Sequence, residues 1–150
     1  MKILSKSESI TLLKDNYIGH LSYIAQGHPF TLPITYFYDL GSNAIISYSA
    51  EGHKIDAMRK NGAVSLEVEE IVSNNNWHSI LAHGTFEELK GTDAKYYLHQ
   101  FTEGVKSIIK EKEHTLPEFI SEFSSKSSSK KIPVVYRFKI LEITGRRKEA

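Results

Sequence analysis

The stretch YIGHLSYIAQGHPFTLPITYFYD, residues 17–39, decides the fold class of this chain. Apolar and polar side chains follow one another along it with a period of two, which is typical of strands that bury one face. The turn-forming residues QGHP at 26–29 separate two such runs. We therefore predict an antiparallel hairpin with strands over about 18–25 and 30–38, in which Pro33 favours an edge position or a bulge.

Four further segments show the same period. The clearest is AVSLEVEEI, in which every second residue from Val64 to Val68 is apolar and the residues between them are polar. The predicted strands lie near residues 44–49, 63–71, 77–89 and 132–145. Six mainly antiparallel strands in a chain of 150 residues predict a closed or nearly closed β-barrel, because closure removes exposed strand edges.

Helical patterns flank these strands. The segment SKSESITLLKDN offers Ser5 or Ser7 as an N-cap, followed by an apolar stripe. Other helical segments are predicted over about 52–60, from Thr92–Asp93 onward, and within 105–123 with a break before Pro117, and the polar stretch 124–131 is predicted to be a loop. The fold class that follows is mainly β with flanking helices.

Composition sets limits on function. The 150 residues are long enough for one domain, 1–150, with a sizeable core, and the net charge of +1 gives no bulk reason to expect nucleic acid or a membrane as partner. The chain contains no cysteine, which excludes disulfides and thiolate chemistry. It shows neither a signal peptide nor an apolar run of membrane-spanning length, so a cytoplasmic location is expected.

Familiar catalytic motifs are missing. The seven histidines include no His-x-His or His-Glu-x-x-His pair, so a bound metal is not expected. The sequence lacks a Gly-x-Ser-x-Gly elbow, a P-loop and a Gly-x-Gly-x-x-Gly turn. The carboxylates at 67–70 and 87–88 are interpreted as outward-facing, solubilising residues of strands.

The segment SYSAEGHKIDAMRKN, residues 47–61, poses a question of charge. His53 and Lys54 stand at the start of a predicted helix, where the helix dipole already favours an anion. A bound anion would resolve the conflict, because free backbone N–H groups and a lysine together form an anion site. The alternative is that Ser49 caps the helix while His53 and Lys54 are solvated, with Lys54, Arg59 and Lys60 all exposed.

Three stretches taken in order, GHLSYIAQGHPFTLPITYFYD, NAIISYSAEGHKIDAMRKNGAVSLEVEE and WHSILAHGTFEEL, resemble the pyridoxamine 5′-phosphate oxidase-like FMN-binding split barrels. Within that family the chain is similar to the branch related to nitroimidazole-resistance flavoproteins, over about residues 17–89. The resemblance implies a six-stranded antiparallel split barrel. It also implies a homodimer with FMN in each of two clefts at the subunit interface.

The resemblance also implies which residues hold FMN. The PITY stretch would run alongside the flavin ring, SYSAEGHK would surround the phosphate, and the start of the 77–89 strand would approach from across the cleft. Where the oxidase branch has an arginine this chain has His53, which weakens one phosphate contact. The cofactor-binding residues expected in this way are Pro33, Ile34, Thr35, Tyr36, Ser47, Ser49, His53, Lys54, Trp77 and Ser79.

The C-terminus departs from the oxidase pattern, which ends in a segment with Trp and Arg that holds pyridoxal phosphate. This chain ends in LEITGRRKEA and its single tryptophan is Trp77, so oxidation of pyridoxamine phosphate is not expected. Arg146 and Arg147 either reach a phosphate on the partner subunit or form a solvated basic tail.

Two functions remain open. The first is an FMN-dependent oxidoreductase that reduces a nitro compound, a quinone or a similar small electrophile with electrons from NAD(P)H. The second is a non-catalytic module that binds or stores flavin or haem, or regulates through the same cleft. In either case the chemistry belongs to the cofactor, and the protein supplies binding and access.

Overall fold

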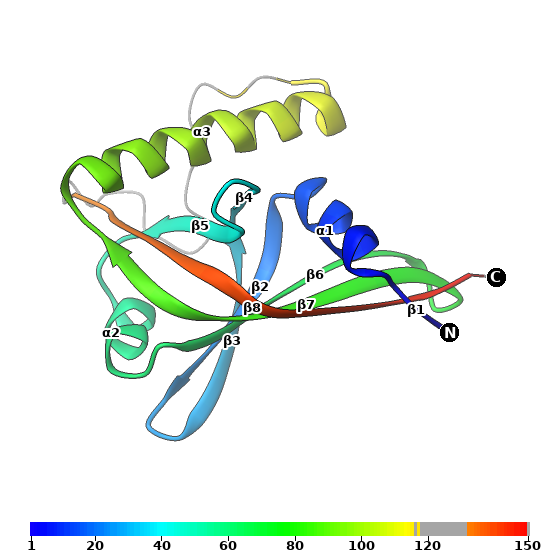
Figure 1. The fold of residues 1–150 in the computed structure, drawn as a ribbon, viewed down its shortest axis with the longest axis horizontal. Helices are drawn as coiled ribbons and strands as arrows, with labels where there is room; N and C mark the ends of the chain where they lie inside the picture. The colour runs from blue at the N-terminus through cyan, green and yellow to red at the C-terminus, as the bar shows by residue number, and fades with distance from the viewer. Residues whose placement is uncertain (116, 118–131, 150) are drawn as a thin grey trace.

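The computed structural model describes residues 1–115, 117 and 132–149, and its strands form one antiparallel sheet that curls around the core (Figure 1). Seven of its eight strands lie in the order β3-β2-β6-β7-β8-β5-β4, and the eighth, β1, pairs with β8. Their bounds are β1 Lys2–Ile3, β2 Ile18–Ala25, β3 His28–Thr35, β4 Phe37–Asp39, β5 Ala44–Ser49, β6 Ala63–Ser73, β7 Asn76–Leu89 and β8 Val134–Lys148. The predicted mainly β architecture with flanking helices is confirmed, with eight strands in the described residues instead of six.

One of the two extra strands, β4, has a physical reason. The segment predicted as one strand over 30–38 is two, because β3 pairs with β2 whereas β4 pairs with β5. Tyr36 lies between them, and its backbone N–H donates to the carbonyl of Tyr17, 2.8 Å away. The chain therefore changes partner at Tyr36, and β3 stays at one end of the sheet. Pro33 lies on this edge strand, as its missing N–H predicts.

The helix α1, Lys6–Lys14, begins as the sequence indicates. Of the two serines offered as caps, Ser5 is the N-cap, and its hydroxyl accepts from the N–H of Glu8 at 3.1 Å. The Glu8 carboxylate accepts in return from the N–H of Ser5 at 3.0 Å, which completes a capping box. Leu12 and Leu13 from this helix join the barrel core, so α1 closes one end of the sheet.

The helix α3, Gly91–Glu113, is continuous where the sequence indicated two helical pieces. It covers β5 and β4 (Figure 1), and Phe101 and Val105 bury against Ile46 in a second, smaller core. Gly104 permits this approach, because a Cβ there would overlap the ring of Phe37. The remainder of the helix predicted within 105–123 and the loop predicted at 124–131 lie mostly outside the described residues. No helix in the described ranges is both long and apolar enough to cross a bilayer.

A bulge in β8 changes which residues of that strand face the core. His83 of β7 pairs with Glu142, but the next residue, Gly84, pairs with Ile140, so Leu141 is one residue extra. Leu141 is 74% exposed. Side chains on the core side of β8 therefore have even numbers before the bulge and odd numbers after it.

Candidate functional site

The site suggested by the sequence begins at the N-terminus of α2, His53–Lys60. Gly52 is the N-cap, and it offers no side chain to the first turn. The capping alternative for Ser49 is wrong, because its hydroxyl donates to the carbonyl of Ala50 at 2.8 Å. The first turn of α2 thus lacks the side-chain cap that most helices carry, and this is the arrangement that favours an anion.

The expected exposure of Lys54 is wrong. Lys54 was predicted to be exposed together with Arg59 and Lys60, yet it is 7% exposed while the other two are exposed. The reason is helical geometry: Lys54 lies one turn before Met58, and the face that carries Met58 packs on the sheet. Lys54 is therefore a buried lysine in the first turn of α2.

His53 is held by aromatic neighbours from the β2–β3 hairpin. Its Nδ1 lies 2.9 Å from the hydroxyl of Tyr23, and its ring centroid lies 5.0 Å from that of Phe30. Burial raises the pKa of Tyr23, so the hydroxyl keeps its proton. With Tyr23 as donor to Nδ1, the neutral imidazole carries its own proton on Nε2. The outward side of the ring is then a hydrogen-bond donor, which is what an anion requires.

The predicted PITY and SYS residues contact one another next to Tyr36, where the chain changes from pairing with β2 to pairing with β5. The hydroxyl of Ser47 on β5 donates to the carbonyl of Thr35 at the end of β3, with an O···O distance of 2.7 Å. Both residues are buried. Ile34 and Tyr36 are 1% and 0% exposed and belong to the barrel core, because even-numbered residues of this stretch point inward. A flavin contact from these two residues stays a prediction, while Pro33 is partly exposed on the outer face.

Trp77 and Ser79 lie at the other end of the molecule. Trp77 pairs with Lys148 and Ser79 with Arg146, whereas the end of β7 near α2 is Leu89. From Trp77 to Leu89 the strand spans about 40 Å, and Figure 1 shows α2 and the far end of the β6–β7 hairpin on opposite sides. A single chain therefore does not bring the two predicted groups together.

The two C-terminal arginines differ in their surroundings. Arg147 lies 3.8 Å from a carboxylate oxygen of Glu8 and lines a cavity of about 370 Å³ together with Trp77. Arg146 is exposed and stands opposite Ser79 across the β7–β8 pair. Arg146 is thus the arginine on the same face of the sheet as the predicted flavin residue.

Arg59 is a residue that the sequence reasoning missed. Its guanidinium donates to both carboxylate oxygens of Glu51 at 2.7 Å, and to Glu88 at 2.7 and 3.0 Å. These hydrogen bonds hold the pKa of Glu88 below its usual value. Arg59 ties the loop before α2 to the end of β7, so the carboxylate of Glu88 has a structural partner and is not simply solvated. Glu87 likewise pairs with Arg137, at 3.1 Å.

A second cluster joins residues that the sequence reasoning treated separately. His20 stands opposite Glu67 in the β2–β6 register, and its Nδ1 lies 3.2 Å from the carboxylate. Glu69, two residues on along β6, adds a third group, and one ligand atom from each lies within 4.8 Å of the others. Burial and the neighbouring Glu69 carboxylate raise the pKa of Glu67. The cross-strand register that unites these groups is not visible in the spacing of the sequence.

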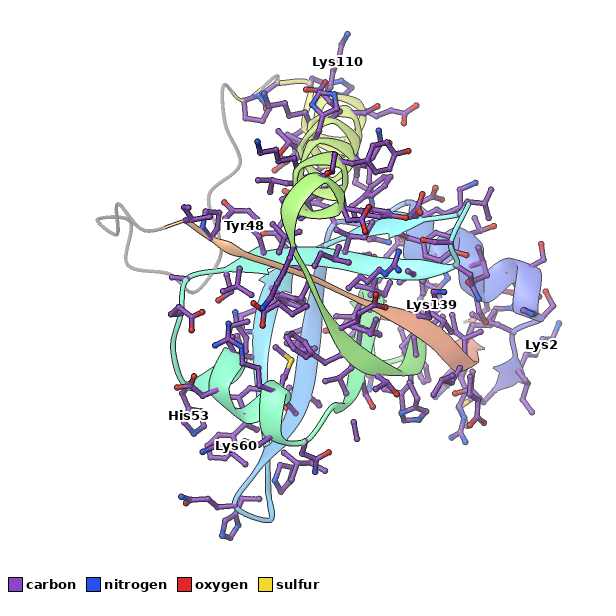
Figure 2. All side chains as sticks on the ribbon, turned by 60° about the vertical axis from the view of Figure 1, so that its left-hand side comes forward. Lys2, Tyr48, His53, Lys60, Lys110 and Lys139 are labelled. Atoms are coloured by element: carbon purple, nitrogen blue, oxygen red, sulfur yellow. The ribbon has the colours of Figure 1, made fainter. Side chains whose placement is uncertain are left out.

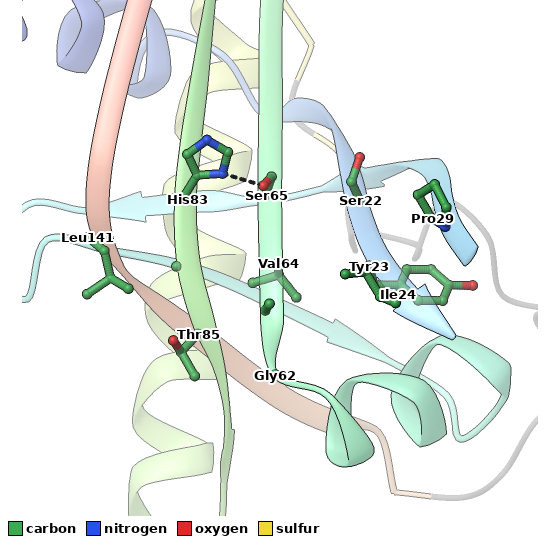
Figure 3. A pocket seen from close by; sticks show the side chains of 12 residues that line it. Ser22, Tyr23, Ile24, Pro29, Gly62, Val64, Ser65, His83, Thr85 and Leu141 are labelled. Carbon is green, nitrogen blue, oxygen red and sulfur yellow. Dashed lines mark hydrogen bonds between the residues drawn. The ribbon is translucent and has the colours of Figure 1, made fainter. Parts of the chain in front are cut away.

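A cavity of about 540 Å³ lies on the outer face of the sheet, between the β2–β3 hairpin, the start of β6 and the middle of β7 (Figure 3). Ser65 and His83 line it, with the Ser65 hydroxyl 2.6 Å from Nδ1 of the histidine (Figure 3). Ile24, Pro29 and the bulged Leu141 supply apolar walls. The volume falls within the range of about 300–1,000 Å³ that small-molecule sites occupy.

Comparison with known proteins places the chain in a family. A sequence model of the family described as pyridoxamine 5′-phosphate oxidase matches residues 5–147. The chain belongs to the pyridoxamine 5′-phosphate oxidase family. An uncharacterized protein of Rhizobium meliloti (strain 1021), RA0666, is 30% identical over 97 residues, which are 65% of this chain and 63% of that protein.

Solved structures agree on the fold. A structure described as a FAD-binding protein from Mesorhizobium loti superposes with a TM-score of 0.75 at 25% identity, covering 99% of this chain and 98% of the other. A structure described as a putative 5-nitroimidazole antibiotic resistance protein from Bacteroides thetaiotaomicron gives a TM-score of 0.66 at 16% identity, with 96% and 86% covered. The predicted split-barrel class and the resemblance to this branch are confirmed.

Proposed function

We propose that this chain is a flavoprotein that binds FMN at the N-terminus of α2. The observation that carries the proposal is the first turn of that helix, which has no side-chain cap and holds the buried Lys54 beside the aromatic-bound His53. A lysine beside the free backbone N–H groups of a helix start is the arrangement expected where a phosphate binds. The similarity to the Mesorhizobium loti protein, described as FAD-binding, supports a flavin without deciding between FMN and FAD.

The proposed site needs two subunits. Lys54 and His53 would hold the phosphate from one chain, while Trp77 and Ser79 of a second copy would approach the ring. In one chain about 40 Å of β7 separates Trp77 from the end of the strand near α2. A second subunit would bring the two groups together. We therefore propose a homodimer with one flavin at each of two equivalent interface sites.

The proposed activity is the reduction of a small electrophile, such as a nitro compound or a quinone, with electrons from NAD(P)H. A bound flavin supplies the electron-transfer chemistry, and the protein's residues bind and orient it. His53 would donate a hydrogen bond to the phosphate through Nε2, Lys54 would add a full charge, and Pro33 would leave its stretch of edge strand open beside the ring. Oxidation of pyridoxamine phosphate is not part of the proposal, because the chain's C-terminal segment lacks the tryptophan expected for it.

The phosphate contact is tested by comparing FMN with riboflavin, which lacks the phosphate. Lys54→Met keeps the length and packing of the buried side chain but removes its charge. We expect this variant to bind FMN about 10-fold more weakly or worse, since a charged hydrogen bond contributes about 1.5–3 kcal/mol, and to bind riboflavin as the wild type does. Lys14→Met, on the exposed surface of α1, is the control and should bind both as the wild type does. An equal loss for both ligands would remove Lys54 from the phosphate site.

The two-subunit site is tested by mixing variants. Lys54→Met and Trp77→Ala should each bind flavin weakly as homodimers, whereas mixed dimers regain one intact site in two. Recovery of tight binding after the two variants are unfolded and refolded together would support the shared site, and a mixture no better than its parts would contradict it. Turnover of NADH or NADPH with nitroaromatics and quinones then separates an oxidoreductase from a flavin-storing or regulatory module, which would bind flavin without turnover.

A further inference from the structure

A groove of about 280 Å³ runs between α2 and the turn of the β2–β3 hairpin. Four residues of α2 form one wall, at the spacing i, i+3, i+4 and i+7 that places them on one face of a helix. These residues are His53, Asp56, Ala57 and Lys60. Figure 2 shows His53 and Lys60 on this side of the molecule, above the tip of the hairpin.

The opposite wall is a tight turn. Gln26 and Gly27 have φ values of 52° and 77°, and Ala25 pairs with His28 across them, which is the pattern of a two-residue type I′ hairpin loop. Gly27 leaves this side of the groove open, because no atom lies within 4 Å of the position that a Cβ would take. A turn of this kind fixes the width of the groove without filling it.

The groove continues directly from the proposed phosphate site. His53 belongs to both, because it begins α2 and also lines the groove. Lys60 lies seven residues further along the helix, at a rise of about 10 Å. A ligand whose phosphate binds at the start of α2 would therefore enter the groove with whatever is attached beyond that phosphate.

The lining suits an adenine nucleotide. Lys60 is exposed and forms no ion pair with any residue that the structure describes, so it is available for a second phosphate. Asp56 offers a carboxylate that can accept from ribose hydroxyls. The side-chain oxygen of Asn61 already accepts from the N–H of Ala63 at 3.1 Å, which leaves its NH₂ to donate to a base nitrogen.

The walls between these polar groups are apolar. Ile24 and Ala25 of the hairpin face Ala57 of the helix across the groove. Flat heterocycles bind in such slots, with a few polar groups at the edge to fix their orientation. The volume is slightly below the range of about 300–1,000 Å³ typical of whole small-molecule sites, which fits one half of a dinucleotide better than a complete cofactor.

We propose that this groove binds the adenosine monophosphate half of a dinucleotide whose other half reaches the flavin site. The inference rests on the proposed flavin function, and it extends that function from a mononucleotide to a dinucleotide. Two cofactors share this chemistry: FAD, whose flavin half would occupy the site itself, and NAD(P)H, whose adenine half would lie here while its nicotinamide meets bound FMN.

The test compares three ligands in three proteins. Dissociation constants for FMN and FAD, and KM for NADH with FMN bound, are measured for the wild type, for Lys60→Ala and for the control Lys95→Ala. Lys95 is an exposed lysine on α3, away from the groove. Both substitutions are on the surface, and equal melting temperatures would verify that the fold is intact.

The two possible ligands predict changes in different quantities, the dissociation constant for FAD or the KM for NADH. If it comes from FAD, the wild type binds FAD at least about 10-fold more tightly than FMN, and Lys60→Ala weakens FAD by about 10-fold while FMN changes less than about twofold. If it comes from NAD(P)H, Lys60→Ala raises the KM for NADH by a similar factor and leaves both flavins unchanged. Either pattern supports the groove, provided Lys95→Ala changes nothing.

A third result overturns the inference. If FMN binds but Lys60→Ala alters neither FAD affinity nor the KM for NADH, the groove is not a nucleotide site, and the flavin proposal stands without it. If neither flavin binds to the wild type, the proposed function itself fails. The two failures are therefore distinguishable in one set of titrations.

Discussion

Replacing Tyr36 with phenylalanine separates a core role from a cofactor role. The Tyr36 hydroxyl donates to the carbonyl of Leu13 at 2.7 Å, and both residues are fully buried. That carbonyl lies in the last turn of α1, where carbonyls have no partner within the helix. Tyr36→Phe removes the donor and leaves a buried acceptor unsatisfied, which should lower the free energy of unfolding at pH 7 by about 1–3 kcal/mol.

The pH dependence of this loss is a sharper check. Burial raises the pKa of Tyr36 well above its ordinary value of 10.0. A raised pKa means that the folded protein keeps the proton when the unfolded chain loses it, so stability is fully present below pH 10 and is lost as the pH rises further. Phenylalanine has no ionisable group, so the stability of the variant lacks this dependence on pH. The deficit of Tyr36→Phe should therefore narrow above pH 10, by up to about 1.4 kcal/mol per pH unit.

Urea unfolding at pH 7, 9.5 and 11 measures the deficit directly, with the exposed Tyr96→Phe as control. At pH 7 the control should unfold within about 0.5 kcal/mol of the wild type, and the Tyr36 variant should melt about 2–4 °C lower for each kcal/mol of stability that it loses. A deficit that stays constant from pH 7 to 11 would refute the view that Tyr36 is shielded from solvent. The affinity of the variant for FMN tests the other role: the flavin contact predicted for Tyr36 requires weaker FMN binding, whereas unchanged binding would mean that the hydroxyl serves the core alone.

Two further predictions concern stability. Ser5→Ala removes the capping box of α1 and should cost about 1 kcal/mol, whereas Ser7→Ala should cost much less; equal melting temperatures for the two would contradict the cap. Glu69→Gln should stabilise the protein at pH 7 by on the order of 0.5 kcal/mol, because it removes the negative charge beside Glu67. Burial and Glu69 raise the pKa of Glu67 in the folded protein. The stability that comes with this raised pKa is therefore fully present below about pH 4.5 and is lost as the pH rises through the folded pKa. The gain should therefore shrink near pH 4 in urea titrations; the same gain at both pH values, or a similar gain for the exposed control Glu103→Gln, would contradict it.

The sequence predicts local structure well where one signal dominates. The period of two and the turn at 26–29 correctly predicted the β2–β3 hairpin, and of the edge position or bulge that Pro33 favoured, the edge position is the one observed. The change of partner at Tyr36 was missed, because the alternation continues through it while only the tertiary pairing changes. The helical piece predicted from residue 92 and the described beginning of the second piece are one helix, Gly91–Glu113.

In the candidate site, too, the sequence predicts local features but not those that depend on tertiary packing. The residues near the start of α2 are neighbours in sequence, so the pattern could predict them as a group, and their role in binding stays a prediction. The burial of Lys54 and the hydrogen bonds of Arg59 to Glu51 and Glu88 depend on how α2 lies against the sheet, which spacing alone does not give. The cluster of His20 with Glu67 was not predicted, because it arises from the register between β2 and β6.

The bulge at Leu141 affects how this chain should be aligned with its relatives. One extra residue reverses the inward and outward positions of everything that follows it in β8, so Arg146 faces outward beside Ser79. If the alternation ran through residue 141 unbroken, Arg147 would face outward and Arg146 inward. An alignment that runs through residue 141 without a gap, against a relative that lacks the bulge, would equate arginines from opposite faces of the sheet. Comparing the C-terminal basic residues of this family therefore requires the strand register as well as the residue count.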